Sequence, residues 1–87
     1  MFTGIVETQG VIYARIIKDG CLYLEMDAAG LDNAAVQVGD SIAVSGVCLT
    51  AVRIVATRIA FEISTETLGC TRLGQLMEGD KVNLELA

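Results

Sequence analysis

Hydrophobic and polar residues alternate along three well-separated segments of the chain. Residues 21–27 (CLYLEMD) place Leu22, Leu24 and Met26 on one side and polar or aromatic residues on the other. Residues 58–64 (RIAFEIS) and 81–86 (KVNLEL) show the same alternation, with apolar residues at every second position from 59 and from 82. A period of two residues is typical of β-strands with one buried face. The pattern therefore predicts three half-buried strands.

Three further strands are expected from shorter or less regular patterns. Ile42 and Val44 alternate with serines at 41 and 45, residues 50–55 (TAVRIV) continue the sheet, and residues 4–16 (GIVETQGVIYARI) open the chain. We also expect two short helical turns, one at residues 31–35 and one at 65–68, where Gly69 ends the second.

Glycines mark the turns, because the chain has nine glycines and no proline. Residues 18–20 (KDG) predict a tight hairpin turn, since Asp-Gly accepts a positive φ angle. Residues 38–42 (VGDSI) and 78–82 (EGDKV) repeat one device, a Gly-Asp turn that leads into a strand. The pattern as a whole predicts an all-β fold, a six-stranded antiparallel barrel that is closed so that its edges are not exposed.

The length and the apolar content suggest a single small domain that associates with a partner. A chain of 87 residues is too short for two independent cores. A domain of this size buries only about 60% of its unfolded surface, so it gains modest stability from its own core. The hydrophobic fraction of 53% is high, and the apolar residues that the core does not need favour an oligomer interface or a missing companion domain.

The charge excludes several classes of partner. The net charge is −5 and the pI is about 4.4, whereas a nucleic-acid binder needs a basic surface. Anionic membranes and phosphorylated substrates are disfavoured for the same reason. The chain shows no apolar run near 18 residues and no signal-peptide pattern at its start, so we expect a cytoplasmic protein.

The cysteines suggest neither a metal site nor a disulfide framework. Cys21, Cys48 and Cys70 are widely spaced, and the chain has no histidine, so we expect no bound metal. Reduced and mostly buried thiols are the default expectation. The absence of histidine also removes the usual general base at neutral pH.

The residues that could act in catalysis or binding also have purely structural explanations. Composition alone favours Cys48 as a small apolar residue packed in the barrel wall, and Ser41 and Thr50 could be ordinary strand hydroxyls. The residues at 64–67 (STET) read as the cap of a short helix, or as a cradle for a polar heterocycle. Gly4 would let the backbone approach a ligand closely. The pattern alone indicates a small acidic β-barrel that could bind a ligand.

Three motifs together resemble the N-terminal half of riboflavin synthases. They are MFTGIVE at residues 1–7, GDSIAVSGVCLT at 39–50 and STETL…T.LG.L..GD.VNLE at 64–85. The resemblance implies that residues 1–87 form one Greek-key barrel, the first of two in the family's chain. Each barrel of the family holds one 6,7-dimethyl-8-ribityllumazine. Two such molecules dismutate by transfer of a four-carbon unit, which yields riboflavin and a pyrimidinedione without any cofactor.

The resemblance also implies which residues form the site. The ligand would lie against three segments of the barrel, namely Gly4, Ile5 and Val6; Cys48, Leu49 and Thr50; and Glu62, Ile63, Ser64, Thr65, Glu66 and Thr67. Ser41 and Cys48 would take the catalytic roles. Many family members carry asparagine where this chain has Ser45, which affects a local hydrogen bond rather than the site.

Two other classes of function compete with a riboflavin synthase domain. A non-catalytic relative could hold lumazine or flavin as a fluorophore, as antenna proteins do, but Thr3, Ser41 and residues 48–50 match the enzyme. An oligonucleotide-binding barrel is disfavoured by the acidic charge and by only four aromatic residues. The expected partners are 6,7-dimethyl-8-ribityllumazine and riboflavin, with a homodimer for the isolated domain and a trimer for full-length relatives. The single barrel should bind substrate with little or no turnover.

Overall fold

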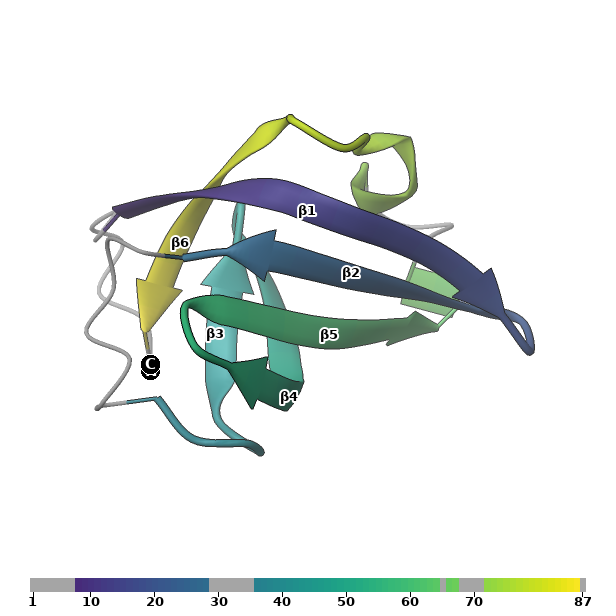
Figure 1. Cartoon of the computed structure of the whole chain (residues 1–87). Helices are drawn as coiled ribbons and strands as arrows, with labels where there is room; N and C mark the ends of the chain where they lie inside the picture. Colours follow the sequence, from purple (N-terminus) through teal and green to yellow (C-terminus); the bar gives the residue numbers. More distant parts are fainter. Residues whose placement is uncertain (1–7, 29–35, 65, 68–71, 87) are drawn as a thin grey trace.

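The chain folds into a closed barrel of six antiparallel strands (Figure 1). The computed structural model describes residues 8–28, 36–64, 66–67 and 72–86. The strands are β1 (Thr8–Lys18), β2 (Cys21–Asp27), β3 (Ser41–Val44), β4 (Val47–Val55), β5 (Arg58–Ser64) and β6 (Lys81–Leu86).

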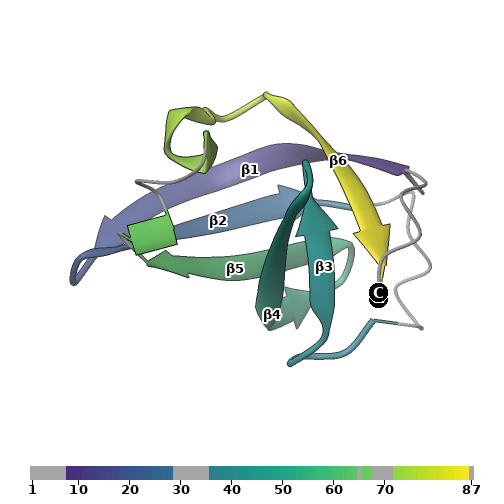
Figure 2. The ribbon, with the colours of Figure 1, turned by 180° about the vertical axis from the view of Figure 1, so that it is seen from behind.

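The strands follow a Greek-key order, β1-β2-β5-β4-β3-β6, around the barrel. Strands β3, β4 and β5 follow one another as neighbours, and β6 returns to lie beside β3, as the view from behind shows (Figure 2). The predicted six-stranded antiparallel Greek-key barrel is therefore confirmed.

Three strands agree with the alternation pattern, whereas β4 begins earlier than predicted and β1 ends later, at Lys18 rather than at residue 16. β2, β5 and β6 occupy the predicted ranges 21–27, 58–64 and 81–86. β4 begins at Val47 rather than at residue 50, because the turn before it is tight and residues 47–49 already pair with β3. The early part of the first predicted strand, residues 4–7, lies outside the described residues.

Apolar side chains from all six strands fill the inside of the barrel. The largest fully buried ones are Phe61, Ile12, Leu22, Leu24, Met26, Ile42, Ile59, Ile63, Leu84, Val44 and Val82. The alternation placed Ala60 and Glu85 on the opposite face, yet they are only 8% and 7% exposed. The alternation thus identified the core side chains correctly, but it did not predict that some side chains on the opposite face are nearly buried too.

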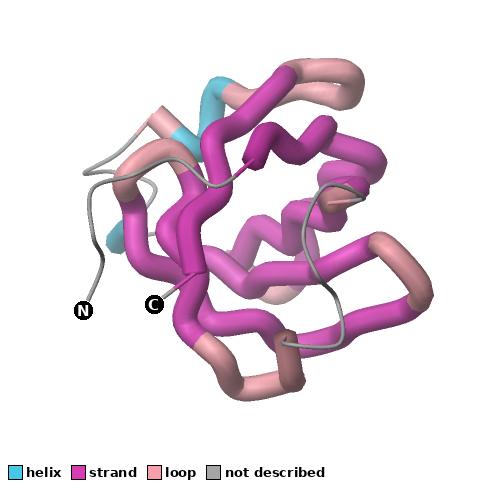
Figure 3. Tube along the Cα trace, turned by 90° about the vertical axis from the view of Figure 1, so that its left-hand side faces the viewer, coloured by secondary structure: helices cyan, strands magenta, loops and turns pink. Residues whose placement is uncertain are grey.

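The described helical content is small and lies on one side of the barrel (cyan in Figure 3). Glu66 and Thr67 are helical, as predicted for residues 65–68, and a 3₁₀ turn, η2 (Leu73–Gln75), was not predicted. The predicted helical turn at 31–35 and the stop at Gly69 lie outside the described residues. No helix within the described ranges is long and apolar enough to cross a membrane.

The two Gly-Asp turns have the same geometry. Gly39 and Gly79 adopt φ angles of 97° and 93°, a region that favours glycine. In each turn the following aspartate, Asp40 or Asp80, accepts a hydrogen bond through Oδ2 from the backbone N–H three residues earlier, at 2.9 Å and 2.8 Å. The prediction that the same Gly-Asp turn occurs twice is confirmed.

Each Gly-Asp turn binds the backbone of a neighbouring strand at an irregularity in that strand. Gly39 N–H donates to the Ala51 carbonyl at 2.8 Å, and Ala51 N–H donates back to the Asp40 carbonyl at 3.0 Å. Gly79 N–H donates to the Ile12 carbonyl at 2.9 Å, and Ile12 N–H returns a 2.8 Å bond to the same turn. The strand register shifts just after Ala51 in β4 and just after Ile12 in β1. The strands β1–β3 and β4–β6 therefore form two corresponding halves.

Two hairpin turns have positive φ angles at both of their central residues, a conformation that suits short antiparallel hairpins. Asp19 and Gly20 (φ 54° and 79°) join β1 to β2, which confirms the predicted turn. Ser45 and Gly46 (φ 47° and 86°) join β3 to β4. Ser45 also bonds to Asn83: its N–H donates to the Asn83 carbonyl at 2.7 Å, and its Oγ accepts from Asn83 N–H at 3.3 Å. Serine at this position therefore keeps a local hydrogen bond.

Candidate functional site

A depression of about 370 Å³ lies on the outside of the barrel. Strands β4 and β5, which pair side by side, form it together with the helical turn that follows β5. Its lining residues are Cys48, Leu49, Thr50, Val52, Glu62, Ile63, Ser64 and Thr67. The structure thus brings together residues 48–50 of the second predicted segment and Glu62, Ile63, Ser64 and Thr67 of the third.

The β4 side of the depression presents a thiol and a hydroxyl. Leu49 and Ala51 point into the core, at 6% and 1% exposure, so the alternating residues Cys48 and Thr50 point outward. Cys48 is exposed, and the interpretation of Cys48 as a packed core residue is therefore wrong. The early start of β4 at Val47 explains this orientation, because it sets which residues of the apolar run face the core.

Ser41 lies beside this wall but not in the depression. It is half-buried on β3, directly opposite Thr50 in the register, so the two side chains share the outer face. Ser41 is not among the residues that line the depression. The structure therefore places the two predicted catalytic residues, Ser41 and Cys48, on neighbouring strands of the same outer face.

The β5 side contributes a carboxylate and a hydroxyl. Glu62 and Ser64 are exposed, while Phe61 and Ile63 point into the core at 0% and 1% exposure. Among the described residues that line the depression, Glu62 alone is charged. The depression therefore combines a largely neutral surface with one hydrogen-bond acceptor of full negative charge.

Ser64 caps the helical turn that closes one end of the depression. Thr67 N–H donates to Ser64 Oγ at 3.3 Å, and the two hydroxyls hydrogen-bond at 3.2 Å. This is the capping arrangement that the sequence predicted. Glu66 is exposed in the same turn and is not among the lining residues, whereas Gly4, Ile5, Val6 and Thr65 lie outside the described residues.

Two side chains on β2 stand next to Glu62. Tyr23 lies directly opposite Glu62 in the register, and Cys21 lies opposite Ser64. Partial burial raises the pKa of Tyr23, and the charge of Glu62 raises it further. Partial burial also raises the pKa of Cys21, and the neighbouring Glu62 carboxylate raises it further. Both groups therefore stay protonated at neutral pH.

The expectation of mostly buried thiols was wrong for the two cysteines that the structure describes. Cys21 is half-buried and Cys48 is exposed, while Cys70 lies outside the described residues. Over the described ranges, no group of three or more acidic or cysteine side chains is placed to hold a metal ion.

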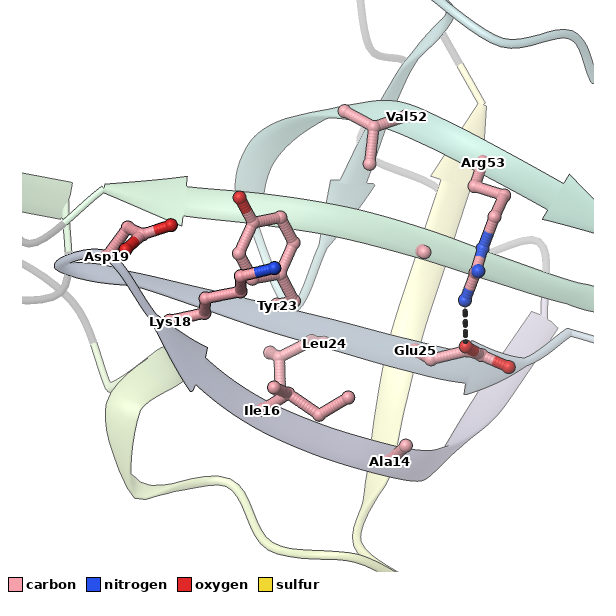
Figure 4. Close-up of a pocket in the computed structure, with 10 residues that line it drawn as sticks. Ala14, Ile16, Lys18, Asp19, Tyr23, Leu24, Glu25, Val52 and Arg53 are labelled. Atoms are coloured by element: carbon pink, nitrogen blue, oxygen red, sulfur yellow. Dashed lines mark hydrogen bonds and ion pairs between the residues drawn. The ribbon is translucent and has the colours of Figure 1, made fainter.

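A second, larger hollow of about 420 Å³ adjoins the depression (Figure 4). Its lining residues are Ala14, Ile16, Lys18, Asp19, Tyr23, Leu24, Glu25, Val52, Arg53 and Ala60. Arg53 and Glu25 form an ion pair of 2.8 Å in it, between side chains that are 65% and 20% exposed. Its two basic and two acidic side chains balance in formal charge, and one basic and one acidic side chain form this ion pair.

Val52 lines both the depression and the larger hollow. Sequence reasoning missed it as a site residue. The signal was present, because Val52 continues the outward alternation of Cys48 and Thr50 along β4.

The family comparison covers nearly the whole chain. A family model described as the lumazine binding domain matches residues 3–87. The chain is 41% identical to the riboflavin synthase of Photobacterium phosphoreum and 44% identical to that of Bacillus amyloliquefaciens. Each alignment covers 100% of this chain and 40% of the relative. The chain therefore spans about two fifths of the length of these relatives.

Solved structures of LumP share the fold. LumP complexed with 6,7-dimethyl-8-(1'-D-ribityl) lumazine superposes with a TM-score of 0.93 at 31% identity, over 100% of this chain and 49% of that one. LumP complexed with riboflavin superposes with a TM-score of 0.91 at 31% identity, over 99% of this chain and 46% of that one.

Proposed function

Because the chain belongs to the family of lumazine binding domains, we propose that it binds 6,7-dimethyl-8-ribityllumazine and riboflavin in the depression across β4 and β5. One observation carries the proposal: two groups of residues that the resemblance to riboflavin synthases implies as ligand contacts line one depression, namely residues 48–50 and Glu62, Ile63, Ser64 and Thr67. LumP, which is similar to this chain, is solved with both ligands.

The chemistry of the depression suits these ligands. Both carry a flat ring system rich in donors and acceptors, and a ribityl chain that carries hydroxyls and no phosphate. A protein of net charge −5 therefore meets no electrostatic penalty when it binds them. The hydroxyls of Thr50 and Ser64 and the carboxylate of Glu62 offer hydrogen-bond partners at the surface of the depression.

A titration with matched threonine variants tests the binding proposal. Thr50→Val removes a hydroxyl from the depression and keeps the side-chain shape, whereas Thr57→Val makes the same change in the exposed turn between β4 and β5. Loss of one hydrogen bond should raise the riboflavin Kd about three- to tenfold for Thr50→Val alone. Quenching of riboflavin fluorescence gives each Kd. No quenching by the unaltered protein would contradict the proposal.

We propose that the domain is the first barrel of a transferase of the riboflavin synthase type, with Ser41 and Cys48 in catalytic roles. The reaction consumes two lumazines, and this chain offers one depression made from β4 and β5. Correct placement of a second reactant can be worth about 7–11 kcal/mol. The isolated domain should therefore bind substrate with little or no turnover.

Absorbance of newly formed riboflavin, after incubation with 6,7-dimethyl-8-ribityllumazine alone, measures this turnover. Addition of the second barrel of a related riboflavin synthase, as a separate chain, should restore activity. Steady turnover at a rate typical of enzymes by this chain alone would contradict the proposal.

We propose that the isolated domain forms a homodimer. Large apolar side chains remain exposed on β1, at 39% for Val11, 48% for Tyr13, 57% for Ile16 and 68% for Ile17. A second copy that covers this surface would remove these side chains from water, which stabilises association in proportion to the apolar area buried. Sedimentation velocity at micromolar concentration distinguishes the dimer from the monomer.

A further inference from the structure

The outer face of the β2–β5 pair carries two opposed side chains, of which only Glu62 belongs to the proposed ligand site. Tyr23 and Glu62 are direct partners in the register, and both point outward, because the residues on either side of them are buried. Directly opposed residues on neighbouring antiparallel strands have Cβ atoms about 4.5–5.5 Å apart. Their side chains are therefore neighbours on the barrel surface.

This pair lies on the boundary between the two hollows. Glu62 lines the depression, Tyr23 lines the larger hollow, and Val52 lines both. Figure 4 shows that Tyr23 extends from β2 across β5, with its hydroxyl on the side of Val52. The phenol thus reaches from its own strand toward the wall of the depression.

The protonation state of the phenol suits a donor role. Partial burial and then the nearby charge of Glu62 raise the pKa of Tyr23 above its ordinary value of 10.0. The hydroxyl therefore keeps its proton over the whole neutral range, and the neighbouring Glu62 carboxylate is an acceptor for that proton.

We propose that Tyr23 is a positioning residue, which holds the Glu62 carboxylate where it accepts hydrogen bonds from hydroxyl groups of the ligand's ribityl chain. This inference rests on the proposed function. A carboxylate accepts hydrogen bonds and donates none, so it must face donors on the ligand. The imide edge of the ring offers one N–H between two carbonyl oxygens, which would repel a carboxylate. Neighbouring hydroxyls of a polyol can each donate to one of its two oxygens.

The proposal predicts that Tyr23 determines specificity for the polyol chain rather than for the ring. Loss of the Tyr23 hydroxyl frees the exposed Glu62 side chain to rotate into solvent, so that the ligand must order it on binding. Lumiflavin carries the flavin ring with a methyl group in place of the ribityl chain. Its binding should therefore not depend on Tyr23 or on Glu62.

Tyr23→Phe tests this, with Tyr13→Phe as the matched control, since Tyr13 lies on β1 with its ring beneath Arg58. Fluorescence titrations with riboflavin and with lumiflavin should show a riboflavin Kd raised about three- to fivefold by Tyr23→Phe and about tenfold by Glu62→Gln. Neither change should alter the lumiflavin Kd. Tyr13→Phe should leave both ligands unaffected, and thermal unfolding shows that each variant is folded.

A double variant separates positioning from a direct contact. Tyr23→Phe should add nothing to Glu62→Gln, because the tyrosine acts through the carboxylate. Equal losses for riboflavin and lumiflavin, additive losses in the double variant, or an unchanged riboflavin Kd in Tyr23→Phe would each overturn the proposal. If the unaltered protein fails to bind riboflavin, the proposed function itself fails, which is a different result from binding that does not depend on Tyr23.

Discussion

The two halves of the barrel share a backbone scheme and differ in the side chains that they turn outward. The Gly-Asp turn of each half binds a strand of the other half at the point where the register of that strand shifts. These points are Ile12 in β1 and Ala51 in β4. Counted from these residues, Val11 corresponds to Thr50 and Tyr13 corresponds to Val52.

The outer surfaces of β1 and β4 suit different tasks. β4 presents Cys48 and Thr50 to a depression. β1 presents Val11 and Tyr13, and the guanidinium of Arg58 lies 3.7 Å from the centre of the Tyr13 ring. The turns and bulges are alike in both halves, whereas the outward side chains differ, and only those of β4 line the depression that we propose as the ligand site.

Tryptophan at the corresponding positions of the two halves should have the largest effect. Thr50→Trp fills the depression and should weaken riboflavin binding by about 100-fold or more, because the ring system and the indole occupy the same space. Val11→Trp makes the matched change in the other half and should leave the riboflavin Kd unchanged. Fluorescence titration gives both values. Equal losses would show that the two halves do not differ in ligand binding.

The two Gly-Asp turns should be equally sensitive to alanine. Gly39→Ala and Gly79→Ala force a side chain into φ angles of 97° and 93°, although a Cβ atom would meet no other atom within 4 Å. The backbone strain alone should lower the free energy of unfolding by about 1–2 kcal/mol in each variant. Urea denaturation measures the loss. A large loss in one variant and none in the other would refute the equivalence of the halves.

A lysine substitution on each half tests which surface forms the proposed dimer contact. Ile16 and Val55 are equally distant from the register shifts of β1 and β4, and they are 57% and 59% exposed. Ile16→Lys should raise the dimer dissociation constant about tenfold, because it places a charge in the proposed contact, whereas Val55→Lys should not. Sedimentation at several concentrations gives both constants. The reverse result would assign association to the other half.

Cys21 and Tyr23, which both lie on β2 in the first half, should lower the stability of the protein at alkaline pH. The pKa values of Cys21 and Tyr23 are raised in the folded state. The folded protein therefore keeps protons that the unfolded chain releases above the ordinary thiol value of 9.0. The free energy of unfolding should be unaffected by these groups below about pH 8 and should fall as the pH rises past about 9.

A cysteine variant isolates the contribution of Cys21. Cys21→Ala should reduce the alkaline loss of stability. Thermal unfolding between neutral and alkaline pH measures the slope of stability against pH in the variant and in the unaltered protein. Identical slopes would show that Cys21 does not contribute.

The strands and turns could be predicted because their causes are local. Alternation in residues 21–27, 58–64 and 81–86 reports one buried face, and Asp-Gly and Gly-Asp pairs favour turns through their own backbone preferences. The exposure of Cys48 could not be predicted in this way. It lies in an apolar run, and the turn at Ser45–Gly46 decides which of its residues face the core.

Side-chain pairs and hydrogen bonds between strands that are distant in the sequence could not be predicted either. The Tyr23–Glu62 pair depends on the register of β2 against β5, and the correspondence of the halves depends on hydrogen bonds such as that between Gly79 and Ile12. The resemblance to riboflavin synthases supplied Glu62 as a contact, but nothing local to either residue links it to Tyr23.

Ligand protection of Cys48 tests most directly whether the depression across β4 and β5 is the binding site. Cys48 is exposed there, while Cys21 is half-buried with a raised pKa, so iodoacetamide should modify Cys48 first in a Cys70→Ser background. With riboflavin at about ten times its Kd, modification of Cys48 should slow about tenfold, because only the free protein reacts. An unchanged rate, at a riboflavin concentration that saturates the fluorescence signal, would contradict the account.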